Sequence, residues 1–216
     1  MSERLRIALT KGRLQDHSVE LFEAMGIDCT PIHHPGRRLI HSFPNYPLDA
    51  VLAKAPDVIT YVEHGVCDLG IVGKDTILEK GGAFYEVLDL GFGRCRFALA
   101  VKEGSDFYGT YRTRCIASKY PEVTRAFFEK KGMDVDIIKI EGSVELAPIL
   151  GLADGIVDIV ETGATLKENG LVPIETAAQV SARLIVNTAS MKLRKQEILS
   201  FIGRCQSVLE QRTNKT

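Results

Sequence analysis

Residues 145–166 read ELAPILGLADGIVDIVETGATL, and this stretch decides how the surrounding chain folds. Residues 144–150 carry a helical pattern. An apolar strand follows at 156–160 and leads into a threonine-glycine turn at 162–165, just before a short helix. A strand of this kind, apolar apart from Asp158, is typical of a parallel sheet covered on both faces.

The alternation of strands and helices continues in both directions along the chain. Pro56 opens a helix, as proline in a first turn commonly does. Gly26 ends an earlier helix, in a position that favours a left-handed residue. Residues 31–47 look irregular apart from a short run at 38–40. We expect strands at 5–10, 68–73, 87–90, 96–101, 114–118, 135–140, 156–160, 171–174 and 184–186, and helices at 14–25, 56–64, 121–131, 144–150 and 192–211.

The pattern restarts after Gly93, which indicates two lobes. Because the last strands lie far from the core pattern of the second lobe, we expect the chain to cross back to the first. The expected lobe I holds residues 1–92 and 181–216, and lobe II holds residues 93–180. The expected fold class is α/β, two-lobed and similar to type II periplasmic binding proteins, with mostly parallel sheets and a central cleft. Such folds bind ligands at the carboxyl ends of their strands.

The composition excludes several classes of protein. The 216 residues are 45% hydrophobic and 25% charged, as in ordinary globular proteins, and the net charge of −1 argues against nucleic acid or an anionic membrane as partner. No stretch approaches a membrane-spanning length, and residues 1–6 lack the apolar region of a signal peptide. The five cysteines form no C-x-x-C pair. We therefore expect buried, reduced thiols in a cytoplasmic protein.

The turn at 162–165 has the composition of a phosphate-binding site. Gly163 lets the backbone approach a ligand closely, and the hydroxyls of Thr162 and Thr165 accompany the backbone amides around Ala164. We call residues 162–165 the phosphate cup. Taken alone, Thr-Gly-Ala-Thr is more often an ordinary turn between a strand and a helix. The order and spacing of the acidic residues before it, within one supersecondary unit, favour the functional interpretation.

Those acidic residues are Glu145, Asp154 and Asp158. The hydroxyls of a phosphorylated ribose need hydrogen-bond acceptors, and a diphosphate needs Mg²⁺, which prefers carboxylate oxygens. Asp154 by itself would usually be a solvated turn residue. Together with the phosphate cup, the three carboxylates predict a site for a ribose phosphate.

The whole stretch resembles the phosphoribosyl-pyrophosphate signature of ATP phosphoribosyltransferase, the first enzyme of histidine biosynthesis. That signature is a Glu, five residues, a Gly, a small residue, then Ile or Val, Asp, and finally Ser/Thr-Gly-x-Thr-Leu. The chain matches it without a gap at Glu145, Gly151, Ala153, Ile156, Asp158, Thr162, Gly163, Thr165 and Leu166. Further segments that look similar to this family lie, in the same order, at 11–14, 38–40, 68–73, 93–96 and 141–145.

The resemblance implies an activity and a set of site residues. The enzyme would transfer the phosphoribosyl group to N1 of ATP, with substrate-bound Mg²⁺ and inversion at C1. Arg13, Arg38 and Asp158 would be catalytic. Phosphoribosyl pyrophosphate would bind at Glu145, Asp154, Asp158, Thr162, Gly163, Ala164 and Thr165, and ATP or pyrophosphate at Lys11, Gly12, Arg13, Arg38, Asp68, Gly73 and Arg96.

The basic residues owe their roles to the resemblance rather than to their spacing. Lys11 and Arg13 flank a glycine after the first strand, and on spacing alone they would be two solvated cations in a turn. Lys54 stands where relatives can carry an arginine. A lysine keeps the charge but lacks the planar fork that matches phosphate oxygens.

The end of the chain resembles the short catalytic form of the family, which lacks the added regulatory domain of the long form. The resemblance implies a separate regulatory subunit similar to histidyl-tRNA synthetase, and a homodimer within a larger hetero-oligomer. The helix at 192–211 carries an apolar stripe of Ile198, Ile202, Cys205 and Leu209. This stripe could serve assembly, or it could pack on its own lobe.

Two alternative functions and one alternative site compete with this interpretation. A bilobal solute-binding protein would use the same architecture without catalysis, but it would normally be exported. A phosphoribosyltransferase acting on a free base would usually carry an acidic pair directly before its phosphate loop. His33 and His34 suggest a metal site, but adjacent loop residues seldom converge on one ion, so we expect no metal held by the protein alone.

Overall fold

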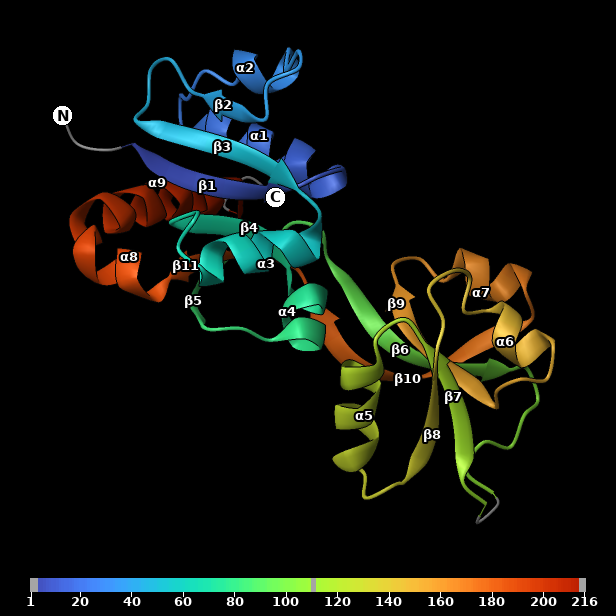
Figure 1. Ribbon diagram of the computed structural model, residues 1–216. Coiled ribbons are helices and arrows are strands. Elements are labelled where there is room, and N and C mark those ends of the chain that lie inside the picture. The colour runs from blue at the N-terminus through green and yellow to red at the C-terminus, as the bar shows by residue number, and fades with distance from the viewer. Residues whose placement is uncertain (1–3, 110–111, 214–216) are drawn as a thin grey trace. The chain divides into compact units, whose positions relative to one another are not determined.

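The computed structural model describes residues 4–109 and 112–213. The chain divides into two compact units, unit 1 with Met1–Gly93 and Ser181–Thr216, and unit 2 with Arg94–Val180 (Figure 1). Each unit has its own mixed sheet and its own core, which confirms the α/β class. Residues 1–3, which are part of the segment that predicts the absence of a signal peptide, lie outside the described residues. In the part of the chain that is described, no helix is long and apolar enough to cross a membrane.

The sheet of unit 1 has the strand order β2-β3-β1-β4-β11-β5. Its central strands β3, β1 and β4 are parallel, and every residue of β4 is buried. The outer strands β2, β11 and β5 join by antiparallel pairing. The bounds are β1 Leu5–Thr10, β2 Ile40–Ser42, β3 Leu48–Ala53, β4 Leu69–Gly73, β5 Phe84–Asp89 and β11 Ala182–Asn187.

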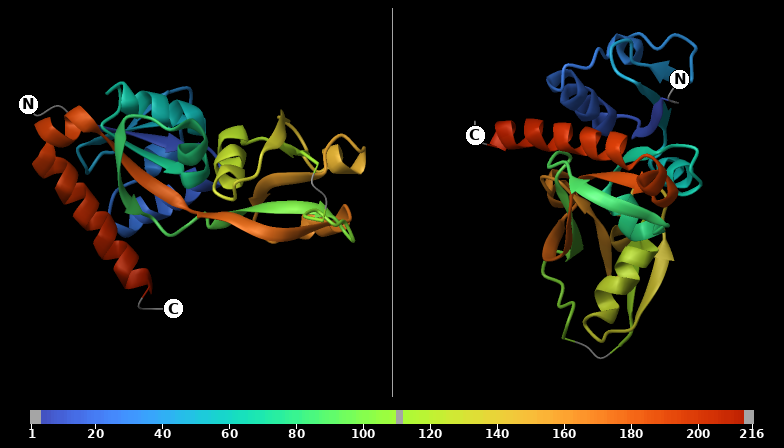
Figure 2. Two further views of the ribbon diagram at one scale, coloured as in Figure 1. Left: turned by 90° about the horizontal axis from the view of Figure 1, so that it is seen from below. Right: turned by 90° about the vertical axis from the view of Figure 1, so that its left-hand side faces the viewer.

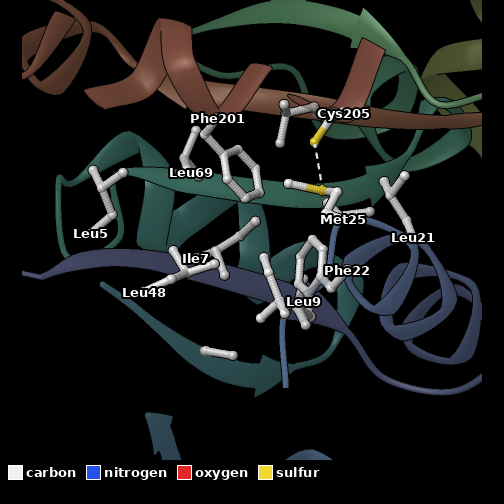
Figure 3. Packing of buried hydrophobic residues seen from close by; sticks show 14 of the residues in the cluster. Leu5, Ile7, Leu9, Leu21, Phe22, Met25, Leu48, Leu69, Phe201 and Cys205 are labelled. Carbon is white, nitrogen blue, oxygen red and sulfur yellow. Dashed lines mark hydrogen bonds between the residues drawn. The ribbon is translucent and has the colours of Figure 1, made fainter. Parts of the chain in front are cut away.

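Helices cover both faces of this sheet. The bounds are α1 Arg13–Ala24, α2 Thr30–His33, α3 Ala55–Glu63, α4 Lys74–Lys80, α8 Thr188–Leu193 and α9 Lys195–Thr213. The long helix α9 lies along one side of unit 1 (Figure 2). Phe201 of α9 packs against Phe22 of α1, with ring centroids 5.9 Å apart, and Cys205 contacts Met25 (Figure 3). The apolar stripe of α9 therefore packs in the core of its own unit.

The sheet of unit 2 has the order β10-β6-β9-β7-β8, in which β9, β7 and β8 are parallel. Helix α5 covers one face, and α6 and α7 cover the other (Figure 1). Strand β9 is central, with β6 antiparallel on one side and β7 parallel on the other. The bounds are β6 Cys95–Lys102, β7 Arg114–Ser118, α5 Pro121–Glu129, β8 Val135–Lys139, α6 Leu146–Ile149, β9 Gly155–Val160, α7 Ala164–Glu168 and β10 Leu171–Val180.

The structure differs from the expected elements in several places, since α2, α4 and α8 were not predicted as separate helices. Two further differences bear on the sheets. Strand β3 was not predicted, because its six residues lie between the prolines at 47 and 56 and offer no clear alternation. The burial of Leu48, Ala50 and Ala53 comes from pairing with β1, a contact between distant parts of the chain. The sheets are also mixed rather than mostly parallel, since the return of the chain adds the antiparallel strand β11 to the first sheet.

The burial of the α9 stripe leads to a stability prediction. Phe201 is 0% exposed, whereas Leu199 on the same helix is 48% exposed. We expect Phe201→Ala to lower the free energy of unfolding by about 3–5 kcal/mol, since it opens a cavity between α9 and α1. Leu199→Ala, the matched control, should cost less than about 1 kcal/mol. Urea unfolding of both variants measures the difference, and equal effects would contradict the packing described.

Candidate functional site

The phosphate cup lies where β9 ends and α7 begins. Gly163 has φ 79° and ψ 5°, a left-handed conformation that residues with a side chain rarely adopt. The backbone N–H of Ala164 donates to Oγ1 of Thr162 at 3.3 Å. Thr162, Ala164 and Thr165 are exposed, while Leu166 is buried and anchors the turn in the core. The cup is thus a fixed turn with exposed hydroxyls.

Helix α7 has only five residues, so its macrodipole adds little to the cup. What the turn can offer an anion is local: the N–H groups at the start of a helix have no partner within the helix. The predicted helix N-terminus is present, but individual amides and hydroxyls, rather than a helix dipole, would bind an anion here.

Asp158 lies on β9, on the face covered by α6 and α7. Its neighbours on that face, Ile156 and Val160, are buried in the same cluster as residues of these helices. Burial raises the pKa of the Asp158 carboxyl, and the charge of Glu145 raises it further. A backbone hydrogen bond from Ile159 and the charge of Lys119 act in the opposite direction. Asp158 is therefore a desolvated acid close to the cup.

Glu145 comes to this place from a different element. It precedes α6, where the buried Val144 and Ala147 hold the chain against the sheet. The charge of Glu145 acts to raise the pKa of Asp158. Glu145 lies at the start of α6, on the face of the sheet that carries Asp158.

Arg96 belongs to the same surface of unit 2. On β6 it pairs with Val160 of β9, and its Nη1 donates to Oγ1 of Thr176 on β10 at 2.8 Å. Its side chain lies on the α6 and α7 face, as Ala98 does. The sequence analysis grouped Arg96 with Lys11, but the structure places it in unit 2 beside the end of β9.

Asp154 is not near the cup, and its predicted role in binding ribose is not supported by its position. It precedes β9, whereas the cup follows it, and a six-residue strand separates the two by about 20 Å. Oδ2 of Asp154 accepts from the backbone N–H of Cys115 at 2.9 Å, and both carboxylate oxygens accept from Arg112. The acid ties the start of β9 to the start of β7.

Burial acts to raise the pKa of Asp154, but the hydrogen bonds from Cys115 and Arg112 outweigh it and hold the pKa below its ordinary value. A pocket of about 540 Å³ opens beside Asp154, far from the cup. Its walls are residues 102–105, Arg112, Cys115, Pro148 and residues 151–154. The carboxylate of Asp154 in its wall is already paired with Arg112.

Several basic residues of unit 1 lie at one edge of the sheet, where the parallel strands end; we call this edge the carboxyl edge. Lys11 follows β1 and Lys54 follows β3, and the N–H of Lys11 donates to Ala53 at 2.9 Å. Gly12, with φ 88°, turns the chain into α1, which begins at Arg13. Lys11, Gly12, Arg13 and Lys54 are all exposed.

Arg38 and Gly73 reach the same edge of unit 1. Strand β2 runs antiparallel to β3 with Ile40 opposite Val51, so the residues before Ile40 continue toward the end of β3. Gly73 ends β4 at its pairing with Ala182. The pairing of strands thus joins residues that lie far apart in the sequence.

Asp68 lies at the other end of β4, and the structure does not place it with Lys11. Its carboxylate accepts from the backbone N–H of Arg6 at 2.8 Å, from Oγ of Ser190 at 2.7 Å and from Arg194 at 3.3 Å. These bonds hold α8 and the start of α9 against the sheet. We therefore assign Asp68 to the fold and not to ATP.

The sequence analysis did not single out three further basic residues, Lys74 and Lys119 directly after strands and Arg183 near the start of β11. Lys74 and Arg183 lie at the carboxyl edge of unit 1, paired with Glu86 at 2.5 and 3.4 Å. Lys119 follows β7 in unit 2 and is exposed. A basic residue directly after a strand that ends in a buried serine is the signal that could have identified Lys119.

Within the described part of the chain, no group of three His, Cys, Asp or Glu residues could hold a metal ion. The Nε2 of His33 instead contacts Glu23 at 2.7 Å.

Two α/β units, each with an edge of exposed polar residues where parallel strands end, define a two-lobed α/β protein. A family model described as ATP phosphoribosyltransferase matches residues 54–207. The chain belongs to the ATP phosphoribosyltransferase family. The resemblance that residues 145–166 indicated is thereby confirmed.

Relatives and solved structures agree with this assignment. The ATP phosphoribosyltransferase of Clostridium kluyveri is 59% identical over 94% of this chain and 93% of its own length. That of Clostridium acetobutylicum is 57% identical over 97% of both chains. A solved ATP phosphoribosyl transferase (HisG:HisZ) complex from Thermotoga maritima matches with a TM-score of 0.81 and 32% identity, over 96% of this chain and 99% of that chain.

A periplasmic sulphonate-binding protein from Escherichia coli matches with a TM-score of 0.62 and 14% identity, over 99% of this chain and 76% of that chain. At this identity the likeness concerns the fold alone. It confirms the expected similarity to periplasmic binding proteins and lends no support to a solute-binding function.

The position of Asp154 leads to a prediction with a pH dependence. Because the side chain of Arg112 is 61% exposed, solvent screens its share, and we expect Asp154→Ala to lower the free energy of unfolding by about 1–2 kcal/mol at neutral pH. A lowered pKa stabilises the fold above the ordinary value of 3.8, and this is lost as the pH falls through the lowered pKa. Below the lowered pKa, the difference in the free energy of unfolding between Asp154→Ala and wild type should disappear.

The control is Asp134→Ala, which removes an exposed acid of the same unit. Unfolding curves at several pH values measure both variants. If Asp154→Ala left stability unchanged but abolished binding of phosphoribosyl pyrophosphate, the assignment of Asp154 to the fold would be wrong.

Proposed function

We propose that this chain transfers the 5-phosphoribosyl group of phosphoribosyl pyrophosphate to N1 of the adenine of ATP and releases pyrophosphate, the first step of histidine biosynthesis. Its family is a family of pentosyltransferases. The observation that carries the proposal is the phosphate cup at the end of β9, with two carboxyls beside it, in a chain of this family.

The cup binds the 5′-phosphate of the substrate. A phosphate dianion takes hydrogen bonds from the hydroxyls of Thr162 and Thr165 and from backbone amides of residues 163–165. The left-handed Gly163 supports this role because it directs consecutive amides toward one spot. Leu166, buried beneath the turn, keeps these donors in place before the substrate arrives.

Asp158 and Glu145 accept hydrogen bonds from the ribose hydroxyls. Both carboxyls reach the α6 and α7 face next to the cup, so a ribose held by its 5′-phosphate lies within their reach. Burial raises the pKa of Asp158, which means that the ionised form is desolvated and gains from a hydroxyl donor. Asp154 takes no part.

ATP and the departing pyrophosphate are assigned to unit 1. Lys11, Arg13, Lys54 and Arg38 end or flank strands at one edge, and their charges suit a triphosphate or a diphosphate. Gly12 and Gly73 allow the backbone to come close. Arg13 and Arg38 are the catalytic candidates here, because guanidinium groups can stabilise two phosphate oxygens at once.

The reaction asks little covalent chemistry of the protein. The lone pair on N1 of adenine forms a bond to C1 of the ribose while the bond from C1 to the pyrophosphate oxygen breaks, with inversion. Positive charge develops on the ribose and negative charge on the leaving group. Fixed cations near the leaving group and carboxylates near the ribose both lower the barrier, and no protein base is needed to activate a ring nitrogen.

Magnesium enters with the substrate in this proposal. Mg²⁺ in such sites commonly keeps several waters and uses substrate phosphates with one or two carboxylates. Glu145 and Asp158 fit that limited donor set, and the described residues offer no larger cluster. Bound there, the ion would neutralise charge on the pyrophosphate.

The proposed assembly includes a regulatory subunit, by analogy with the complex from Thermotoga maritima, and places the enzyme in the cytoplasm. The exposed apolar residues indicate where such a subunit would bind. Most of the α9 stripe is buried in its own unit, so it is not the contact surface. Exposed apolar residues include Leu146, Ile149, Leu150 and Leu152 around α6, Leu193 at the end of α8 and Leu199 on α9.

The function is tested by pyrophosphate release. We expect release from ATP plus phosphoribosyl pyrophosphate with Mg²⁺, and a change in rate when the regulatory subunit is added. Release with adenine in place of ATP would favour an enzyme that acts on a free base. Tight binding without turnover under any condition, with the regulatory subunit present, would favour a binding protein.

The phosphate cup is tested by the pair of changes Thr162→Ala and Thr165→Val. Each removes a hydroxyl donor to a charged group, so we expect the dissociation constant for phosphoribosyl pyrophosphate to rise about tenfold to a hundredfold per change. The KM for ATP should stay near that of the wild type. Thr113→Ala, an exposed threonine at the start of β7, is the control. Unchanged binding in a folded variant would remove the cup from the site.

A further inference from the structure

The surface around the phosphate cup carries an excess of acids. Glu141, Glu145, Asp158 and Glu161 all lie near the carboxyl ends of β8 and β9, and residues 161–166 contain no lysine or arginine. Phosphoribosyl pyrophosphate is itself a polyanion. Hydrogen bonds from neutral amides and hydroxyls do not offset this accumulation of like charge, so a cation of unit 2 at this edge would add to the charge of substrate-bound Mg²⁺.

Strand pairing places Lys119 in the middle of that edge. Ile116 and Ala117 of β7 pair with Gly155 and Ile156 of β9. Continued by two residues, this parallel register sets Lys119 beside Asp158. Ala117 faces α6 and α7, so alternation puts Lys119 on the same face as Asp158.

The backbone that carries Lys119 is held from three sides. Ser118, fully buried, donates from Oγ to the carbonyl of Val157 at 2.6 Å and accepts from the N–H of Tyr120 at 2.9 Å. The N–H of Ile140 donates to the carbonyl of Ser118 at 3.0 Å. A flexible side chain therefore starts from a fixed point between β8 and β9.

The charge of Lys119 is felt by acids on both sides. It acts to lower the pKa of Asp158, against the larger effect of burial, and it adds to the lowering of the pKa of Glu141 that Lys139 causes. The other cations of this edge have closer partners. Lys139 pairs with Glu141 at 2.8 Å, and Arg96 donates to Thr176. Among the described residues, no carboxylate lies within 4.0 Å of the Lys119 ammonium.

We propose that Lys119 is a substrate-binding residue, whose ammonium, next to Asp158 and between the ends of β8 and β9, pairs with a phosphate group of phosphoribosyl pyrophosphate. This inference rests on the proposed function and extends it. It supplies the positive charge that the cup lacks. It also gives the two neighbouring acids a counter-charge while they hold the ribose.

The test measures equilibrium binding by calorimetry for the full chain and for Lys119→Met, Lys119→Arg and Lys130→Met. Lys130→Met is the control, since Lys130 is an exposed lysine at the end of α5, on the opposite face of the sheet. We expect Lys119→Met to weaken phosphoribosyl pyrophosphate about tenfold or more, and Lys119→Arg to restore most of the affinity. Lys130→Met should bind phosphoribosyl pyrophosphate with wild-type affinity. The KM for ATP should be unchanged in all three variants.

Ribose 5-phosphate and inorganic pyrophosphate serve as the two further probes. A loss of ribose 5-phosphate binding in Lys119→Met assigns the ammonium to the 5′-phosphate, and a loss of pyrophosphate binding assigns it to the leaving group. Wild-type affinity of Lys119→Met for phosphoribosyl pyrophosphate overturns the inference and leaves the proposed function intact. A wild-type chain that neither binds this substrate nor releases pyrophosphate overturns both.

Discussion

The pairing of β9 with β6 on one side and β7 on the other is the constraint on which the site of unit 2 depends. Strand β6 pairs with β9 as far as Val160 and so holds the carboxyl end before the turn, while β7 pairs with Gly155 and Ile156 and holds its start. The buried Leu166 then fixes the first turn of α7. Gly163 supplies the one backbone conformation that the turn requires. The cup needs no long helix behind it, because the sheet itself holds the donors.

The course of β9 also separates Asp158, the acid near the cup, from Asp154, an acid that stabilises the fold. Asp154 and Asp158 lie four positions apart in the sequence, yet they stand toward opposite ends of β9. Asp154 is satisfied by Arg112 and Cys115, and its pKa is lowered. Asp158 is desolvated near Glu145, and its pKa is raised. The opposite shifts have local causes: hydrogen bonds outweigh burial at Asp154, which precedes β9, and burial dominates at Asp158 within it.

Several features of the fold and the site could be predicted from the sequence because they depend on local pattern. The apolar run of β9, the turn at 162–165 and the glycine within it are neighbours in the chain, so spacing alone relates them. Strand β3 could not be predicted in this way. Its burial depends on β1, more than forty residues earlier, and its own six residues show no regular alternation. The hydrogen bonds of Asp68 could not be predicted for a similar reason: its partners Ser190 and Arg194 come from the end of the chain.

By itself, the sequence determined the α/β class and the family, and it predicted the phosphate cup, since each follows from residues close together along the chain. Only the tertiary structure decided which charged residues share that turn. Strand order and register bring Arg96 and Lys119 to either side of Asp158, remove Asp154 to the far end of β9 and bury the α9 stripe in unit 1. Pairing between distant strands decides these positions, and no local pattern encodes the distance between two residues on neighbouring strands.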